Sequence, residues 1–297
     1  MLFQQLVNGL TIGSTYALVT IGFNLVYGVL ELTNFAHSSF YMLGAYLTVF
    51  SMTWLLGRVT PLGFFIGLGI SITITAILGA FMDKVALQPI RKRNGAPITA
   101  LLTTVGVQTV INNSILLIFG TESKPFPDVF QLGKIYIGDT VIQIFQIVIF
   151  LVAILLMLGL SYLVYRTKVG NAMRAISQNA TAAKLMGINV NSVITLTFLI
   201  GSAVAAISGA MMGTYYQKID TLMGAAVGLK SISSAVLGGV GSLPGAMYGG
   251  FIIGILETLF AAYIGSGYRD AVAFVIMFVV LIIKPSGLLG VKIETKV

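Results

Sequence analysis

The chain of 297 residues contains no cysteine, a single histidine and few charged residues, which make up 9% of the total. Disulfide bonds and thiol chemistry are therefore excluded. The scattered acids and the one histidine form no metal-ligand spacing, and the chain has neither a Walker A sequence nor a nucleophile elbow. The sequence predicts no metal site, no cofactor and no catalytic residues.

Apolar residues dominate what is present. They account for 57% of the chain, and the mean hydropathy is +0.98. Apolar stretches recur that reach the roughly 20 residues needed to cross a hydrocarbon core. The 34 glycines are typical of closely packed membrane helices. We therefore expect an all-α polytopic membrane protein in which residues 1–297 form one domain.

The apolar runs predict about eight transmembrane helices plus one short Gly-rich segment. We place the helices at about 5–29, 34–56, 61–83, 96–118, 139–165, 193–216, 243–263 and 269–284, and the short segment at 224–240.

Charge predicts which loops share a side of the membrane. The loop at 84–93, the loop at 166–192 and the tail from 284 carry an excess of lysine and arginine, which marks cytoplasmic segments. The loop at 119–139 has mixed charge and is expected outside, together with the N-terminus. For the tail to return to the cytoplasm, either the segment at 224–240 also crosses, as a short span or half-helix, or one of the span boundaries is wrong.

Two polar or glycine-rich breaks interrupt the apolar runs, one at 31–37 and one at 238–245. Unwound backbone is tolerated at membrane depth only where it is buried in protein or lines a wet cavity. Paired breaks in two halves of a chain point to possible inverted repeats and to a translocation site between them. We expect the two breaks to face each other near the centre of the path.

The predicted path residues come from these breaks and from an acid inside an apolar run. They are Asn34, Phe35, His37, Met42, Gly238, Gly239, Gly241, Ser242, Pro244 and Glu257. Each also has a structural interpretation: Asn34 could cap the following helix, His37 could bond a neighbouring carbonyl, and the glycines could serve helix packing. An intramembrane acid such as Glu257 is a functional-site hypothesis by default.

The loop at 166–192 is the one elaborate polar feature of the chain. A short helix is predicted from Ala180 to Met186, capped by Asn179 at its start and followed by Gly187. A second short helix around 172–177 carries Arg174. Such a pair could form a knob that docks on another protein, or it could be an ordinary basic loop.

A resemblance favours docking. TAAKLMGINV is similar to the coupling loop of bacterial ABC importer permeases, which inserts into the ATP-binding subunit. Four further segments, in order and with similar spacing, resemble LivH-type permeases of branched-chain amino acid importers: NGLTIGSTYALVTIGFNLVYGVLELTNFAHSSFYMLGAY, MRAISQNATAAKLMGINV, FLIGSAVAAISGAMMG and VLGGVGSLPGAMYGGFIIGILE. The chain departs from that family's pattern at Ser38 and Ser39, where a glycine and an acidic or bulkier residue are usual.

The resemblance implies a multi-pass permease subunit in the bacterial inner membrane that is not itself an enzyme. The implied partners are a second permease subunit of the LivM type, two cytosolic ATP-binding subunits and a periplasmic or extracellular substrate-binding protein. No nucleic acid is implied, and the surroundings are membrane lipid. The implied coupling residues are Arg174, Asn179, Ala182, Ala183, Lys184, Leu185 and Gly187.

Two other functions stay open at this point. A urea or short-chain amide permease would have the same architecture. A stand-alone secondary transporter would use the broken helices and Glu257 for ion coupling, but it would have no use for a docking loop.

Overall fold

The computed structural model describes residues 1–290 apart from 31, 58, 94 and 131–132. Within these residues seven helical stretches are long and apolar enough to cross a membrane. This confirms an all-α polytopic membrane protein. The helices are α1 (Leu2–Leu30), α2 (His37–Phe50), α3 (Pro61–Met82), α4 (Gln88–Lys92), α5 (Pro97–Phe119), α6 (Ile144–Arg166), α7 (Lys168–Gln178), α8 (Ala180–Leu185), α9 (Val190–Tyr216), α10 (Met223–Gly238), α11 (Leu243–Tyr263) and α12 (Arg269–Ile283).

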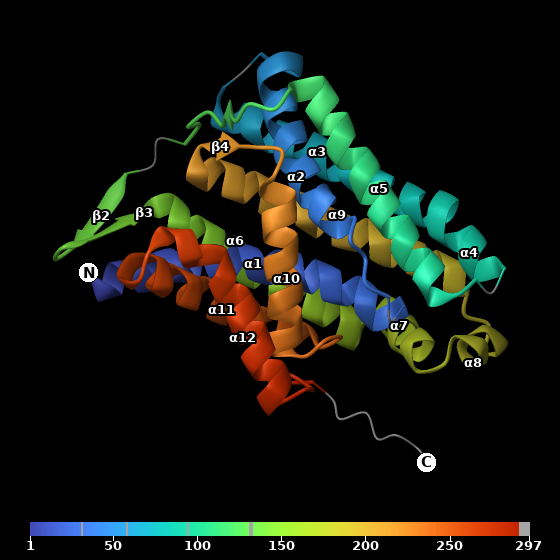
Figure 1. Cartoon of the computed structure of the whole chain (residues 1–297). Coiled ribbons are helices and arrows are strands. Elements are labelled where there is room, and N and C mark those ends of the chain that lie inside the picture. The colour runs from blue at the N-terminus through green and yellow to red at the C-terminus, as the bar shows by residue number, and fades with distance from the viewer. Residues whose placement is uncertain (31, 58, 94, 131–132, 291–297) are drawn as a thin grey trace.

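The strands gather at one end of the bundle, which we call the hairpin end. Strands β2 (Lys134–Ile137) and β3 (Thr140–Gln143) form an antiparallel hairpin beside the N-terminus (Figure 1). The Gln4 amide holds that hairpin: its Nε2 donates to the carbonyl of Val141 at 3.0 Å, and its Oε1 accepts from the same residue's N–H at 2.7 Å. Nearby, β1 (Lys124–Pro125) pairs with β4 (Lys218–Ile219).

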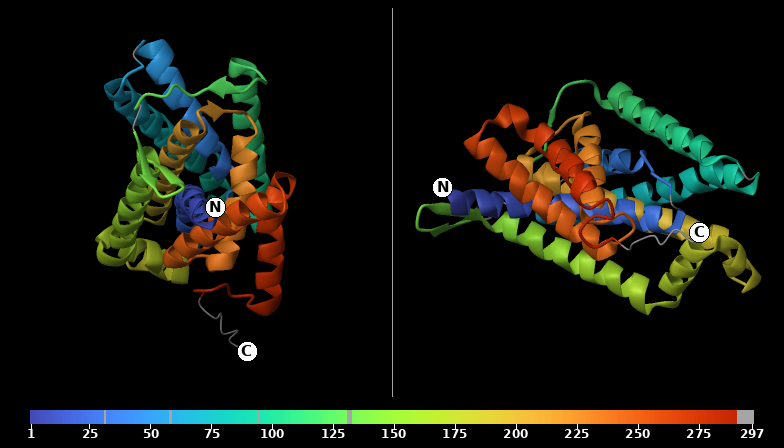
Figure 2. Two further views of the ribbon diagram at one scale, coloured as in Figure 1. Left: turned by 90° about the vertical axis from the view of Figure 1, so that its left-hand side faces the viewer. Right: turned by 60° about the horizontal axis from the view of Figure 1, so that its bottom comes forward.

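The opposite end carries α4, α7 and α8, and we call it the α8 end (Figure 2). Residues of the two basic loops meet here, because Arg91 and Lys92 line the same cavity as residues 176–181. This confirms that the loops at 84–93 and 166–192 share a side. The N-terminus and the loop at 119–139 lie together at the other end.

The predicted span at 34–56 has an unusual form. It is helical only from His37, as α2, and continues as a π-helix over Ser51–Leu55. Before it, the Asn34 side chain accepts a hydrogen bond from the Ala36 N–H at 3.1 Å, which holds the chain in a turn. Helix α2 therefore begins beside the middle of α1, where His37 contacts Val19. Residue 31, the start of the predicted break, lies outside the described residues.

The short segment at 224–240 forms α10, which runs across the middle of the molecule in Figure 1. It starts just after β4 at the hairpin end. Beyond its last residue, Gly241 lies against Gly28 near the α8 end of α1. With 16 residues, α10 is shorter than the seven helical stretches long enough to span a membrane, so the crossing of this segment stays a prediction. Cavities lie on two sides of it.

Helices α1 and α11 pack on a seam of small residues. A Cβ placed on Gly9 would lie 2.7 Å from the Cα of Ile255, and one on Gly13 would lie 2.9 Å from the Cα of Phe251. From the other side, Gly250 lies against Ala17 and Gly254 against Gly13. Larger side chains would force the two backbones apart. The seam fixes α11, and with it Glu257, against α1.

Candidate functional site

The predicted docking element is a pair of short helices at the α8 end. The Asn179 side chain accepts from the Ala182 N–H at 2.9 Å, so it caps α8 as expected. After the helix, Gly187 has a φ of 86°, and the N–H of Ile188 returns to the carbonyl of Ala183 at 3.1 Å. This is a glycine-terminated helix end. The local structure of the loop therefore follows its sequence closely.

Only one residue of α8, Ala183, is buried. Leu185 and Met186 are 84% and 83% exposed, and Lys184 and Ala182 are exposed as well. The preceding helix α7 carries Arg174, whose guanidinium donates to the side chain of Asn171 at 2.6 Å and lies over the ring of Tyr165. The tip of the loop thus presents two large apolar side chains that nothing in the described part of the chain covers.

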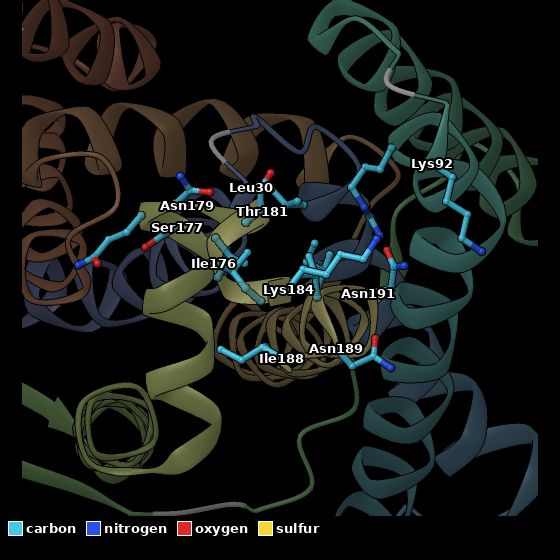
Figure 3. Close-up of a pocket in the computed structure, with 16 residues that line it drawn as sticks. Leu30, Lys92, Ile176, Ser177, Asn179, Thr181, Lys184, Ile188, Asn189 and Asn191 are labelled. Carbon is cyan, nitrogen blue, oxygen red and sulfur yellow. The ribbon is translucent and has the colours of Figure 1, made fainter. Parts of the chain in front are cut away.

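A cavity of about 850 Å³ lies next to this tip, between α8, the start of α9 and α4 (Figure 3). Lys184, Lys92 and Arg91 bring positive charge to it. Arg91 pairs with the fully buried Asp83 at 2.6 Å, and Asp83 also accepts from the hydroxyl of Thr195 at 2.6 Å. This network fixes the α4 loop against α9.

The first break lines a second cavity, of about 260 Å³, which we call the break cavity. Asn34, Phe35 and His37 lie on one side of it, and Gly228 and Leu229 of α10 on another. His37 is buried, with its Nε2 3.1 Å from the carbonyl oxygen of Val19. The cavity contains no charged side chain among its lining residues.

The residues around this break pack tightly on α10. A Cβ on Gly228 would lie 2.5 Å from the Cβ of Ser38, and one on Gly224 would lie 3.1 Å from the Cβ of Met42. Met42 is fully buried there and does not line the break cavity. Ser39 donates to the side chain of Asn112 on α5 at 2.7 Å. The two serines at which the chain departs from its family pattern are therefore contacts between helices.

The second break is a tight turn between α10 and α11. Ser242 caps α11 by accepting from the Gly245 N–H at 3.1 Å, with Pro244 in the first turn. Gly239 has a φ of 107° and lies against Gly290, and Gly238 lies against Gly245. The N–H groups of Leu288 and Leu289 donate to the carbonyls of Leu237 and Gly238 at 2.8 and 2.9 Å. Hydrogen bonds and glycine contacts within the chain thus hold this turn in place.

The structure does not bring the two breaks into one cavity within the described residues. Residues 34–38 meet the middle of α10, whereas Gly241 lines a separate cavity with Asn24 and Gly28. The Asn24 side chain donates to the carbonyl of Ser242 at 3.1 Å. The reason is that the second break follows the end of α10, at the depth of the last turn of α1, while the first lies at mid-depth.

The remaining predicted residue, Glu257, belongs to a cluster of charges. It is fully buried and accepts from Lys230 Nζ at 2.9 Å, and Arg269 Nε lies 2.5 Å away. Lys230 also pairs with Asp270 at 2.8 Å, and the Tyr16 hydroxyl lies 3.2 Å from both Lys230 and Glu257. These residues line a third cavity, of about 270 Å³, which we call the charged cavity. A stand-alone secondary transporter would use Glu257 to bind a coupling ion. Here the carboxylate is already paired with two cations of the chain, which does not favour that role.

Lys230 is the functional candidate that the sequence interpretation missed. It lies in an otherwise apolar and small-residue stretch, AAVGLKSISSAVLGG, and only 8% of its side chain is exposed. A lysine at the centre of a membrane helix is costly without a partner. That isolated charge was the signal that could have found it, and the distant Glu257 was the partner to look for.

Comparisons with known proteins show the family to which the chain belongs. The family model for the permease component of the branched-chain amino acid transport system matches residues 5–281. The permease protein BraD of the high-affinity branched-chain amino acid transport system of Pseudomonas aeruginosa is 39% identical, over 97% of this chain and 95% of its own length. The corresponding LivH of Escherichia coli is 37% identical over the same shares.

One relative of lower identity and one solved structure are also similar to the chain. A probable branched-chain amino acid permease LivH of Methanocaldococcus jannaschii is 27% identical over 92% of this chain and 88% of its own length. Among solved structures, PsaBC from Streptococcus pneumoniae in complex with Fab has a TM-score of 0.47 and 15% identity, covering 96% of this chain and 92% of that one. With a match over nearly its whole length, the chain belongs to the family of branched-chain amino acid transport permeases.

Proposed function

We propose that this chain is the permease subunit of a bacterial ABC importer and forms the membrane path for leucine, isoleucine or valine. It would lie in the inner membrane and pair with a second, LivM-type permease. Two cytosolic ATP-binding subunits would hydrolyse ATP, and a substrate-binding protein would deliver the amino acid at the hairpin end. The names of the full-length relatives support this proposal.

The observation that carries it is the exposed tip of α8. Apolar side chains as exposed as Leu185 and Met186 are explained by a protein partner. The tip is already helical in the chain by itself, with Asn179 capping the helix and Gly187 ending it. A preformed knob binds without a large ordering cost. The basic residues nearby support a cytoplasmic position for this end of the bundle, where ATP-binding subunits would be found.

The test is to replace Gly187 by Glu in the complete transporter. A side chain at a φ of 86° costs about 1–2 kcal/mol, and the new charge would enter the docked surface. We expect less co-purification of the ATP-binding subunits and roughly a tenfold or greater loss of ligand-stimulated ATP hydrolysis, since about 1.4 kcal/mol at the contact corresponds to a factor of ten. Leu185→Glu, which adds a charge without backbone strain, should have the same effect.

The chain offers a matched control in Gly138→Glu. Gly138 also has a positive φ, of 58°, and a Cβ placed on it would have nothing within 4 Å, but it lies at the opposite end, between β2 and β3. This variant should retain the ATP-binding subunits and the ATP hydrolysis measured without the substrate-binding protein, which would dock at the end where Gly138 lies. Equal behaviour of the Gly187 and Gly138 variants would contradict the docking role of α8.

A further inference from the structure

The charged cavity has features that structural ion pairing leaves unexplained. A buried ion pair adds little stability compared with apolar residues of similar volume. Here the pairing is also incomplete, because Glu257 Oε2 is buried and has no hydrogen-bond partner in the described structure. An orphaned buried carboxylate oxygen is costly. A donor group that reached Glu257 Oε2 would complete the pairing.

The cluster contains opposite charges in equal number. Lys230 and Arg269 are balanced by Glu257 and Asp270. A ligand with a single charge would unbalance this group in a low-dielectric site, whereas a zwitterion would not. An ammonium group fits the free oxygen of Glu257, and a carboxylate fits Lys230 or Arg269.

Of the four charged side chains, Asp270 can move away from the cluster into water with little loss of free energy. The side chain of Asp270 is 71% exposed, while that of Lys230 is 8% exposed. A ligand carboxylate can therefore take the place of Asp270 on Lys230 while Asp270 turns to water. The Asp270–Lys230 pair thus keeps the buried lysine neutralised when no ligand is bound.

The rest of the cavity suits an aliphatic side chain. Met212, Met223, Ala226 and Val227 line it, and methionine side chains adapt to differently branched groups. Its volume of about 270 Å³ is at the small end for ligand pockets, which are usually about 300–1,000 Å³. Lys218 and Asp220 also line it, so it is open toward the hairpin end, where the amino acid would arrive.

We propose that the charged cavity is a transient subsite for a zwitterionic aliphatic α-amino acid. Glu257 accepts the α-ammonium group, Lys230 and Arg269 hold the α-carboxylate in place of Asp270, and the methionine wall receives the side chain. This inference rests on the proposed function, because it assumes that the chain transports amino acids.

The absence of cysteine from the chain allows a direct test. Ala225 and Ala226 are consecutive, exposed residues of α10, but Ala225 lines the break cavity and Ala226 the charged cavity. Each is replaced by Cys in the complete transporter, and its reaction with methyl methanethiosulfonate is followed by mass spectrometry of this chain. The reaction is repeated with leucine, with 4-methylpentanoate, which lacks the ammonium group, and with isoamylamine, which lacks the carboxylate.

Leucine should slow the reaction of Ala226→Cys about fivefold or more at saturation, while neither analogue does so and Ala225→Cys is unaffected. Adding Asp270→Asn should lower the leucine concentration that gives half protection about two- to fivefold, the size expected from removing an exposed competing ion pair. A purely structural cluster predicts no protection and no such shift, and either result would overturn the subsite.

A separate measurement distinguishes this inference from the proposed function. The unmodified complex is reconstituted in lipid vesicles, and the import of leucine, isoleucine and valine is measured. If all three amino acids are imported but leucine protects neither cysteine, or both equally, only the subsite is wrong. If none of the three is imported, the proposed function itself fails.

Discussion

The two cavities on either side of α10 differ in how they are built. The break cavity is lined by residues that are close in sequence, 34–38, and is uncharged. The charged cavity draws its paired ionic groups from α10, α11 and α12, with Tyr16 from α1, while Lys218 and Asp220 line it at and just after β4. In the first, the hydroxyl of Ser38 and the ring of His37 are satisfied locally or by one neighbouring helix, whereas Asn34 Nδ2 is buried without a hydrogen-bond partner in the described structure. In the second, each charge depends on another helix, so the charged cavity should be far more sensitive to substitution.

The largest effect is expected from Lys230→Met. It leaves Glu257 fully buried with Arg269 as its remaining cation. Loss of one partner of a buried pair costs about 3–5 kcal/mol, and we expect the lower end because Arg269 stays. Thermal unfolding of the purified complex and amino acid uptake should both decline.

A double variant sharpens this prediction. Lys230→Met with Glu257→Leu removes both buried charges and should recover most of the stability, while uptake stays low because the charges that face the cavity are gone. If the double variant transports normally, the cluster serves only to hold the helices together.

A smaller effect is expected from His37→Ala on the other side of α10. The ring is buried, and a Cβ on Gly22 would lie 2.8 Å from it, so truncation leaves a void between α1 and α2. We expect the free energy of unfolding to fall by about 1–3 kcal/mol. Uptake should be reduced while the partner subunits still co-purify. Wild-type uptake by a stable His37→Ala protein would remove this residue from the path.

The smallest effect is expected from Ser38→Ala. The variant loses the hydrogen bond from the Ser38 hydroxyl to the Phe35 carbonyl, 3.0 Å long, which is worth about 0.5–1.5 kcal/mol. The midpoint of thermal unfolding should fall slightly, and uptake should stay within about twofold of the unmodified protein, because a neutral cavity holds the ligand weakly. A tenfold loss of uptake would place the tighter contact at the break cavity instead.

The parts of this molecule that sequence can predict are those set by local chemistry. Apolar run length predicts the spans, and the residues Asn179 and Gly187 predict the ends of α8, because caps act within a few residues. The start of α2 at His37 differs from the predicted start by a few residues, since the Asn34 turn lies at the beginning of that apolar run.

What cannot be predicted depends on distant contacts. The sequence indicates an unwound piece of the path at 238–245, but the C-terminal residues Leu288 and Leu289 supply donors to the carbonyls before this turn. No local pattern indicates which remote segment will do so. Likewise, a functional role for Glu257 can be predicted because a charged side chain inside an apolar span is unfavourable in free energy. Its pairing with Lys230 cannot be predicted in this way, because it requires the packing of α10 on α11.

The seam of small residues between α1 and α11 has a mechanical consequence. Helices in backbone contact resist sliding and rotation, so the seam opposes any change in the separation of Tyr16 and Glu257. Helix α10 is held to α11 in the same way, since Gly249 lies against Ser234. Helix α12, in contrast, buries only Val272 and Ala273. Tyr16, Lys230 and Glu257 thus belong to helices in backbone contact with one another, whereas Arg269 and Asp270 reach them from a helix that is mostly exposed.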